Sequence, residues 1–298
     1  MLYMGNVNRV IFWLVLPSLL IFYIVFRVVV WQNYDDGGHH LIAEQHALNL
    51  SDRDDIDCLI LGGSNAVFSL SAEQISKQSN LTCYNLSLLD EGFSDEAYFE
   101  FIRNLPIERT QIKTILYSSA IPLHNRYFFE RLEAKQRQID IAGDNDFKFT
   151  GPSLAFYLKN LLQGKSLLKY PMPTSNGDFN FDEYYGCQQD KINDIWIPVT
   201  IDEDFKRWLS QKLLTIGTLF PNANISFVVP STLRSQVTED DFAEFSDALG
   251  FEVVSNSVNY IQQSMFSDVS VLCDGTHHAN ALGREIRTSE LLGLMQNP

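Results

Sequence analysis

The chain has 298 residues, of which 45% are hydrophobic, so it can bury one large core or one domain with a small appendage. Its formal net charge is -15, which argues against nucleic acid as a partner because phosphate binding needs a basic face. The four cysteines show no C-x-x-C spacing, so neither a zinc site nor a thioredoxin-like pair is indicated.

The first 31 residues predict an N-terminal membrane anchor. The stretch Val10–Trp31 is almost wholly apolar, and as a helix it would be roughly 33 Å long, enough to span a bilayer. Arg9 precedes it and Asp35 and Asp36 follow, which favours an amino terminus inside the cell and a domain outside the cytoplasm. A cleaved signal peptide is the alternative, but the run is long for one and no small-x-small cleavage site follows.

Residues 32–55 are polar with one short apolar patch, and they are predicted to form a linker. His39 and His40 lie near two aspartates, a pattern that could suggest a metal site. We interpret the segment as a solvated linker because nothing in the pattern fixes the geometry of these side chains. No metal or cofactor is therefore expected.

The stretch Asp57–Phe68 is predicted to be a buried strand followed by a tight turn. Its apolar residues end at Gly62 and Gly63, which deliver Ser64 onto the turn. Glycines permit a tight backbone there and leave the hydroxyl unshielded, so Ser64 is a candidate nucleophile. A plain structural turn is the alternative, because many loops contain glycine and serine.

From this stretch onward strands alternate with helices, which predicts an α/β domain at residues 56–298. The expected arrangement has three α/β/α layers around a parallel, flavodoxin-like sheet of five strands. After the first strand, the others are expected at Leu81–Leu89, Lys113–Ser119, Asn224–Pro230 and Ser270–Asp274. Helices are expected at Ser71–Gln78, Asp95–Leu105, Asp204–Phe220 and Glu239–Leu249, with a last helix whose opening includes Gly283.

A second candidate group follows the last predicted strand. Asp274 comes directly after that strand and His277 follows on the same short loop, so the carboxylate could orient the imidazole as a general base. His278 is adjacent and is the alternative base. Without a serine nearby, the same residues could be a helix-capping aspartate and two surface histidines. Parallel strands bring their carboxyl ends to one edge, so we expect this group near Ser64.

These blocks resemble the SGNH (GDSL-like) hydrolase superfamily over roughly residues 55–298. The serine block is G-G-S-N, with Gly63 where the common form has aspartate, and Asp274 to His277 fits D-x-x-H. Counting back from Gly283 would instead favour His278 as the base. The resemblance implies a Ser-His-Asp site with Ser64 as nucleophile.

The same resemblance implies oxyanion donors after the second and third strands, where this sequence departs from the family pattern. Gly92 is preferred after the second strand, with Ser87 as the other choice. Asn125 is the asparagine nearest the end of the third strand, where Gly-x-Asn-Asp is usual. Other possible donors there are Ser118, Ser119 and His124.

A long insertion occupies about residues 121–203, with helical patterns at Phe128–Ile141 and Leu154–Leu168. Its aromatic-rich part, Asn176–Cys187, suits a carbohydrate-binding surface or, equally, a small core that packs the insertion. Cys187 could also form a disulfide with Cys273 in an oxidising compartment.

One anchor helix with an exported SGNH-like domain resembles bacterial envelope proteins that modify glycans beside a membrane-bound O-acyltransferase. We therefore expect O-acyl transfer to or from a cell-envelope polysaccharide through an acyl-serine. The chain would sit in the bacterial inner membrane with its domain in the periplasm. The alternative is a catalytically inactive glycan-binding or scaffold subunit of such a complex.

Overall fold

The computed structural model describes residues 13–24, 39–89, 95–119, 171–184, 186–187, 203–228, 258–261, 269–275 and 278–296. The chain divides into two compact units. One comprises Met1–Ile42 and Asp146–Tyr170, and the other comprises Ala43–Asn145 and Pro171–Pro298. The described strands all belong to the second unit, which therefore contains the α/β domain.

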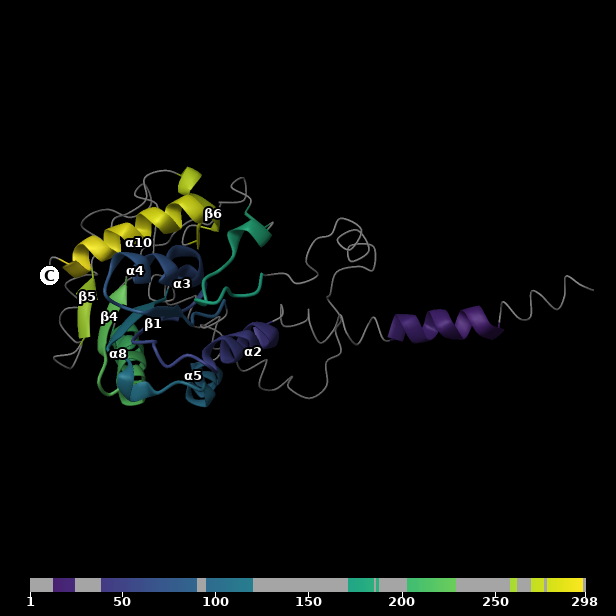
Figure 1. Cartoon of the computed structure of the whole chain (residues 1–298), viewed down its shortest axis with the longest axis horizontal. Helices are drawn as coiled ribbons and strands as arrows, with labels where there is room; N and C mark the ends of the chain where they lie inside the picture. The colour runs from purple at the N-terminus through teal and green to yellow at the C-terminus, as the bar shows by residue number, and fades with distance from the viewer. Residues whose placement is uncertain are drawn as a thin grey trace, which may run out of the picture. The chain divides into compact units, whose positions relative to one another are not determined.

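A parallel sheet forms the centre of the second unit (Figure 1). Its strands are β1 (Cys58–Gly62), β2 (Cys83–Asn85), β3 (Thr114–Ser118), β4 (Asn224–Val228) and β5 (Val258–Ile261). Each neighbouring pair in the order β2-β1-β3-β4-β5 is parallel. This order is the flavodoxin-like one, in which ligands bind beyond the carboxyl ends of the strands at the β1/β3 switch point.

The first four predicted strands are confirmed by β1 to β4, but the placement of the fifth was wrong. Residues Leu272–Gly275 form β6, which pairs with β7 (His278–Ala279) in a separate antiparallel sheet. The position beside β4 is taken by β5 instead. A short apolar run indicates burial but does not specify its partner, which is why Ser270–Asp274 was mistaken for a strand of the main sheet.

Helices cover both faces of the sheet. They are α2 (His39–Leu50), α3 (Ser64–Ser69), α4 (Ala72–Gln78), α5 (Asp95–Asn104), α8 (Glu203–Leu219) and α10 (Ala281–Gln296). Figure 1 shows α3, α4 and α10 on one side of the strands and α5 and α8 on the other. The structure thus confirms four of the predicted helices, as α4, α5, α8 and the last helix, α10.

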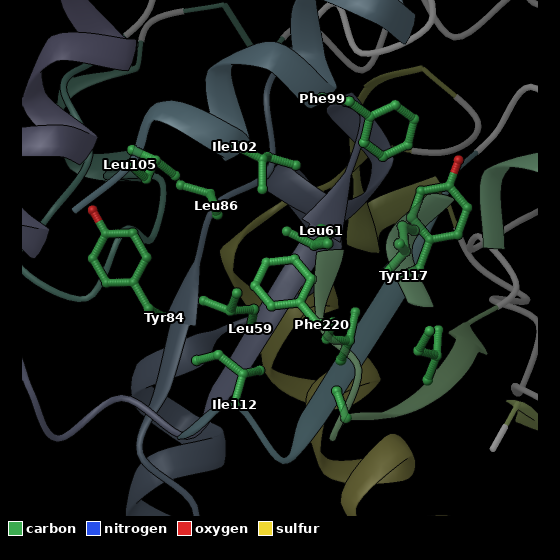
Figure 2. Packing of buried hydrophobic residues seen from close by; sticks show 14 of the residues in the cluster. Leu59, Leu61, Tyr84, Leu86, Phe99, Ile102, Leu105, Ile112, Tyr117 and Phe220 are labelled. Atoms are coloured by element: carbon green, nitrogen blue, oxygen red, sulfur yellow. The ribbon is translucent and has the colours of Figure 1, made fainter. Parts of the chain in front are cut away.

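The two-sided packing follows from the alternation of side chains along β1. Leu59 and Leu61 point into a cluster that includes Ile102 of α5 and Ile216 of α8, part of which is seen in Figure 2. Cys58 and Ile60 belong to the opposite cluster, with residues of α3, α4 and α10. Because every residue of β1 is buried, the sheet edge beside Ser64 is rigidly supported.

Part of the segment predicted as a linker, residues 32–55, forms helix α2. In that helix His46 and Leu50 are buried, and Leu50 packs in the same cluster as Leu59. The predicted helices Phe128–Ile141, Leu154–Leu168 and Glu239–Leu249 lie outside the described residues.

Residues 13–24 of the predicted anchor are helical, and their large apolar side chains are exposed. No helix within the described residues has the length and apolar character needed to cross a bilayer. The rest of Val10–Trp31 lies outside the described residues, so the membrane span stays a prediction.

Cys58 and Cys83 form a disulfide between β1 and β2, where they are register partners. Both residues are fully buried, and their Cα atoms are 4.3 Å apart. This pair was not predicted from the sequence, because a separation of 25 residues does not reveal that two strands are neighbours. Together with Cys187–Cys273, it leaves no free cysteine in the described chain.

Candidate active site

The turn between β1 and α3 holds Ser64 at the carboxyl edge of the sheet. Gly62 has φ +141, and a Cβ atom there would lie 1.8 Å from the carbonyl oxygen of Ser118 in β3. The amide of Gly62 donates to the Tyr98 hydroxyl at 3.0 Å, and the amide of Gly63 donates to Ser118 O at 3.3 Å. Only glycine fits this close approach, so the predicted tight turn is formed and Ser64 begins α3 half-buried.

The hairpin of β6 and β7 brings a histidine and an aspartate to Ser64. His278 Nε2 lies 2.9 Å from Ser64 Oγ, and His278 Nδ1 lies 2.7 Å from Asp274 Oδ1. An ionised carboxylate only accepts hydrogen bonds, so Asp274 selects the tautomer with the proton on Nδ1. Nε2 is then free to accept the Ser64 proton, which is the arrangement of a nucleophile, a base and an orienting acid.

The histidine in this position is His278, which the sequence analysis gave as the alternative base. His277, which was preferred, lies outside the described residues together with Thr276. The contacting pair, Asp274 and His278, are four residues apart, one more than the D-x-x-H spacing. The spacing to Gly283 had favoured this histidine, which lies in β7 just before α10 begins at Ala281.

The carboxylate of Asp274 has two donors and is part-buried. Burial disfavours its charged form, but the hydrogen bond and the charge of His278, with the hydrogen bond of Tyr184, outweigh that effect and hold the pKa of Asp274 below its usual range. The Tyr184 hydroxyl donates to Asp274 Oδ2 at 3.0 Å. Asp274 is thus ionised at neutral pH, as an orienting carboxylate must be.

The imidazole of His278 rests on an aromatic side chain from α3. The ring of Phe68 stacks on it with centroids 4.5 Å apart and planes 14° apart. Phe68 is itself buried against Phe179 at 4.7 Å and meets Tyr184 edge-on at 5.6 Å. These contacts fix the plane of the imidazole, which keeps both of its nitrogens directed at their partners.

The described part of the aromatic-rich segment therefore packs as a small core. Phe179 is buried and contacts Phe181 and Tyr184 as well as Phe68. Asn176–Cys187 was predicted to be either a carbohydrate-binding surface or a small core that packs the insertion. For Phe179, these contacts favour the small core. The guanidinium of Arg284 in α10 covers the ring of Phe181 at 4.6 Å.

The same segment is fixed at two further points. The buried carboxylate of Asp178 accepts hydrogen bonds from the Ser71 hydroxyl at 2.8 Å and from the amides of Ala72 and Glu73 at 2.8 and 3.0 Å, so it caps the first turn of α4. Cys187 forms the disulfide with Cys273, the residue before Asp274. This part of the insertion is therefore built into the site.

The predicted oxyanion donors, Gly92 and Asn125, lie outside the described residues. The amide of Ser87 donates to Asn85 Oδ1 at 3.1 Å, so it is already engaged. The Ser118 hydroxyl accepts from Asn65 Nδ2 at 2.7 Å. Within the described chain, the amide of Ser64 in the first turn of α3 is a further candidate donor, because first-turn amides have no partner inside a helix.

No group of three or more His, Cys, Asp or Glu side chains in the described part of the chain could hold a metal ion. The cysteines there are all in disulfides.

Comparisons with known proteins yield little. No family model and no curated protein matches this chain. Solved structures that match include an acetyl xylan esterase from the rumen bacterium Butyrivibrio proteoclasticus, with 10% identity and a TM-score of 0.38. The match covers 82% of this chain but 64% of the esterase chain, so this chain spans less than two thirds of that protein.

Two residues of the site were not identified from the sequence. Phe68 lies within the serine block, and its position one helical turn after Ser64 was the available signal. Tyr184 is 90 residues from Asp274, and no local pattern joins them. The predicted disulfide Cys187–Cys273 was the one sequence-based observation that could have brought Tyr184 to the site.

Proposed function

We propose that this chain is an extracytoplasmic enzyme that transfers O-acyl groups, acetyl above all, to or from a cell-envelope polysaccharide through an acyl-serine intermediate. The observation that carries the proposal is the continuous hydrogen-bonded series Ser64, His278 and Asp274, with distances of 2.9 and 2.7 Å. Because each of these groups has the partner its role requires, the site fits nucleophilic acyl transfer.

In the first half-reaction Ser64 Oγ attacks the ester carbonyl while its proton passes to His278 Nε2. The tetrahedral intermediate then collapses, and the leaving alcohol takes that proton, which gives an acyl-Ser64 ester and a neutral imidazole. In the second half-reaction His278 removes a proton from the acceptor hydroxyl, which attacks the acyl group. The bond from the acyl carbon to Ser64 Oγ then breaks, and His278 gives the proton to Oγ, so that Ser64 and the neutral imidazole are both restored. Asp274 stabilises the imidazolium at both stages.

The identity of the acceptor decides between the two forms of the activity. If water accepts the acyl group, the protein is a carbohydrate esterase; if a sugar hydroxyl accepts it, the protein is an acyltransferase. The choice depends on how well the bound acceptor is oriented and water excluded.

The disulfides support a place outside the cytoplasm. Cys58–Cys83 and Cys187–Cys273 are bonded pairs, and such pairs persist in oxidising compartments such as the bacterial periplasm. The exposed apolar side chains of helical residues 13–24 support the proposed anchor in the inner membrane. An anchored domain of this kind would act beside a membrane-bound O-acyltransferase that supplies its acyl groups.

The polysaccharide substrate rests on the SGNH resemblance and the proposed topology. The alternative, an inactive glycan-binding or scaffold subunit, would place the serine away from the histidine or bury it. Ser64 is half-buried and within hydrogen-bonding distance of His278, which favours the catalytic proposal.

The test compares purified full-length protein with its Ser64→Ala variant on p-nitrophenyl acetate and on an acetylated polysaccharide. Loss of Ser64 is expected to reduce turnover by at least about 1,000-fold, because it removes the hydroxyl that is proposed to carry the acyl group. A fluorophosphonate probe should label wild type and the control Ser51→Ala, whose exposed hydroxyl caps a local turn, but not Ser64→Ala. Equal turnover in wild type and Ser64→Ala would show that the assignment is wrong.

A transfer assay separates the two forms. Acetyl appearing on an added oligosaccharide, with little free acetate, identifies a transferase, whereas free acetate alone identifies an esterase.

A further inference from the structure

The two oxygens of the Asp274 carboxylate have different partners. Oδ1 accepts from His278 Nδ1 at 2.7 Å, and Oδ2 accepts from the Tyr184 hydroxyl at 3.0 Å. The side chain of Asp274 is 29% exposed, so water has access to the site. A carboxylate held by His278 alone could rotate about its last bond and exchange that contact for water; a second donor on the other oxygen opposes this rotation.

Tyr184 is well placed to supply that second donor because its own ring is held on several sides. The ring packs against Phe68 at 5.6 Å and Phe179 at 5.1 Å, and Phe68 also stacks on the imidazole of His278. One set of aromatic contacts therefore positions both donors to Asp274.

The backbone on either side of Tyr184 is fixed as well. Before it, Asp178 is buried and hydrogen-bonded to the first turn of α4. After it, Cys187 is covalently joined to Cys273, the neighbour of Asp274. The described residues 178–184 and 186–187 thus form a clamp: Asp178 attaches it to α4, Cys187 attaches it to Cys273, and Tyr184 between them presents its hydroxyl to the carboxylate.

We propose that Tyr184 is a positioning residue for the Ser64–His278–Asp274 site: its hydroxyl fixes the orientation and the charge of Asp274, and the Cys187–Cys273 disulfide keeps it in place. The inference rests on the proposed function and deepens it, since it assigns part of the insertion to catalysis. Tyr184 acts through Asp274 and has no role in bonding to the substrate.

The Tyr184 hydroxyl makes the carboxylate of Asp274 less basic. A donor to Oδ2 disperses the negative charge of the carboxylate and contributes to the lowered pKa of Asp274. Without that donor the carboxylate holds protons more tightly. In the described chain, the titratable groups hydrogen-bonded to Asp274 are His278 and Tyr184. The protonation of the site is therefore expected to depend on Asp274, His278 and Tyr184 together.

The test is the Tyr184→Phe variant of the full-length protein, which keeps the ring and removes the hydroxyl. We expect kcat for p-nitrophenyl acetate to fall by about ten-fold, the typical effect of one hydrogen bond to a charged group, while KM changes by less than about two-fold. The acid limb of the kcat/KM profile should also move to higher pH, because an Asp274 carboxylate without its second donor concentrates its negative charge on the contact with the imidazole and favours the protonated, inactive form of the site.

The matched control is Tyr84→Phe. The Tyr84 hydroxyl is also hydrogen-bonded in the fold, to His46 at 2.9 Å, but it belongs to β2 and to the cluster on the opposite face of the sheet. This variant should lose stability and keep the acid limb where it is in wild type. The pH profile therefore separates positioning of Asp274 from a general loss of folding.

The outcomes for the two proposals are distinct. An inactive Ser64→Ala together with a Tyr184→Phe variant that keeps the wild-type kcat and acid limb would overturn the role of Tyr184 alone. A fully active Ser64→Ala would overturn the proposed function itself.

If Tyr184→Phe fails to fold, the Cys187→Ser variant takes its place, because it releases the clamp while leaving the Tyr184 hydroxyl in the chain. This variant should give the same shift of the acid limb. An unshifted limb counts against the proposal.

Discussion

His278 connects the two halves of the site, since each of its ring nitrogens has a different partner. Nε2 faces the Ser64 hydroxyl and Nδ1 faces the Asp274 carboxylate, and the ring between them is stacked on Phe68. Both contacts of the site are therefore made by one imidazole.

This geometry predicts different results for the two adjacent histidines. His278→Ala should reduce acetyl ester hydrolysis by at least about 1,000-fold, because it removes the base of both half-reactions. His277→Ala should stay within about three-fold of wild type, because His278 already contacts both Ser64 and Asp274. Both variants are assayed by steady-state kinetics, and their circular dichroism shows whether they fold. The reverse ranking would restore His277 as the base.

At the scale of elements, the turn from β1 into α3 determines whether Ser64 is presented at all. Gly62 combines φ +141 with a contact between its backbone and Ser118 O, two conditions that other residues cannot meet together. An alanine there would force β1 and β3 apart at the edge where the site forms.

We therefore expect Gly62→Ala to destabilise the domain severely, with a fall in Tm of more than about 5 °C or a loss of folded protein. The control is Gly293→Ala in α10, where an added Cβ would meet no atom within 4 Å. That variant should be neutral or stabilising by up to about 1 kcal/mol, since alanine favours helix. Thermal unfolding of both variants checks the difference, and an unchanged Tm for Gly62→Ala would contradict the geometry of the turn.

The strand before Ser64 could be predicted from the sequence, whereas the hairpin of β6 and β7 and the contact of Tyr184 could not. The strand before Ser64 was predictable because a buried apolar run ending in two glycines has few alternatives. The hairpin of β6 and β7 was not, since a two-residue strand such as β7 carries no periodicity. Tyr184 was missed for a related reason: its contact with Asp274 depends on how the insertion docks, which is a property of the tertiary structure.

At the scale of the whole molecule, the α/β domain must stay folded in the compartment where it works, and one buried histidine limits its acid stability. His46 in α2 is 1% exposed, and its Nδ1 lies 2.9 Å from the Tyr84 hydroxyl. Burial lowers the pKa of His46 to about 3, so the folded protein keeps this side chain neutral across the physiological range.

The effect on stability has a definite sign. Between pH 6.5, the ordinary pKa of histidine, and about 3, the unfolded chain binds a proton at His46 that the folded chain does not. The free energy of unfolding should therefore decrease as the pH falls below 6.5, by up to about 1.4 kcal/mol per pH unit from this residue. Above pH 6.5 the contribution of His46 is constant.

The corresponding experiment measures urea unfolding of wild type and His46→Gln between pH 7 and pH 5. Wild type should lose about 2 kcal/mol more than the variant over this range, because glutamine does not titrate. Tyr84→Phe should keep the wild-type slope, since it removes the hydroxyl but leaves the imidazole buried. Parallel slopes for wild type and His46→Gln would mean that His46 is not kept neutral by burial, and that the acid sensitivity of the fold has its origin in the carboxylates instead.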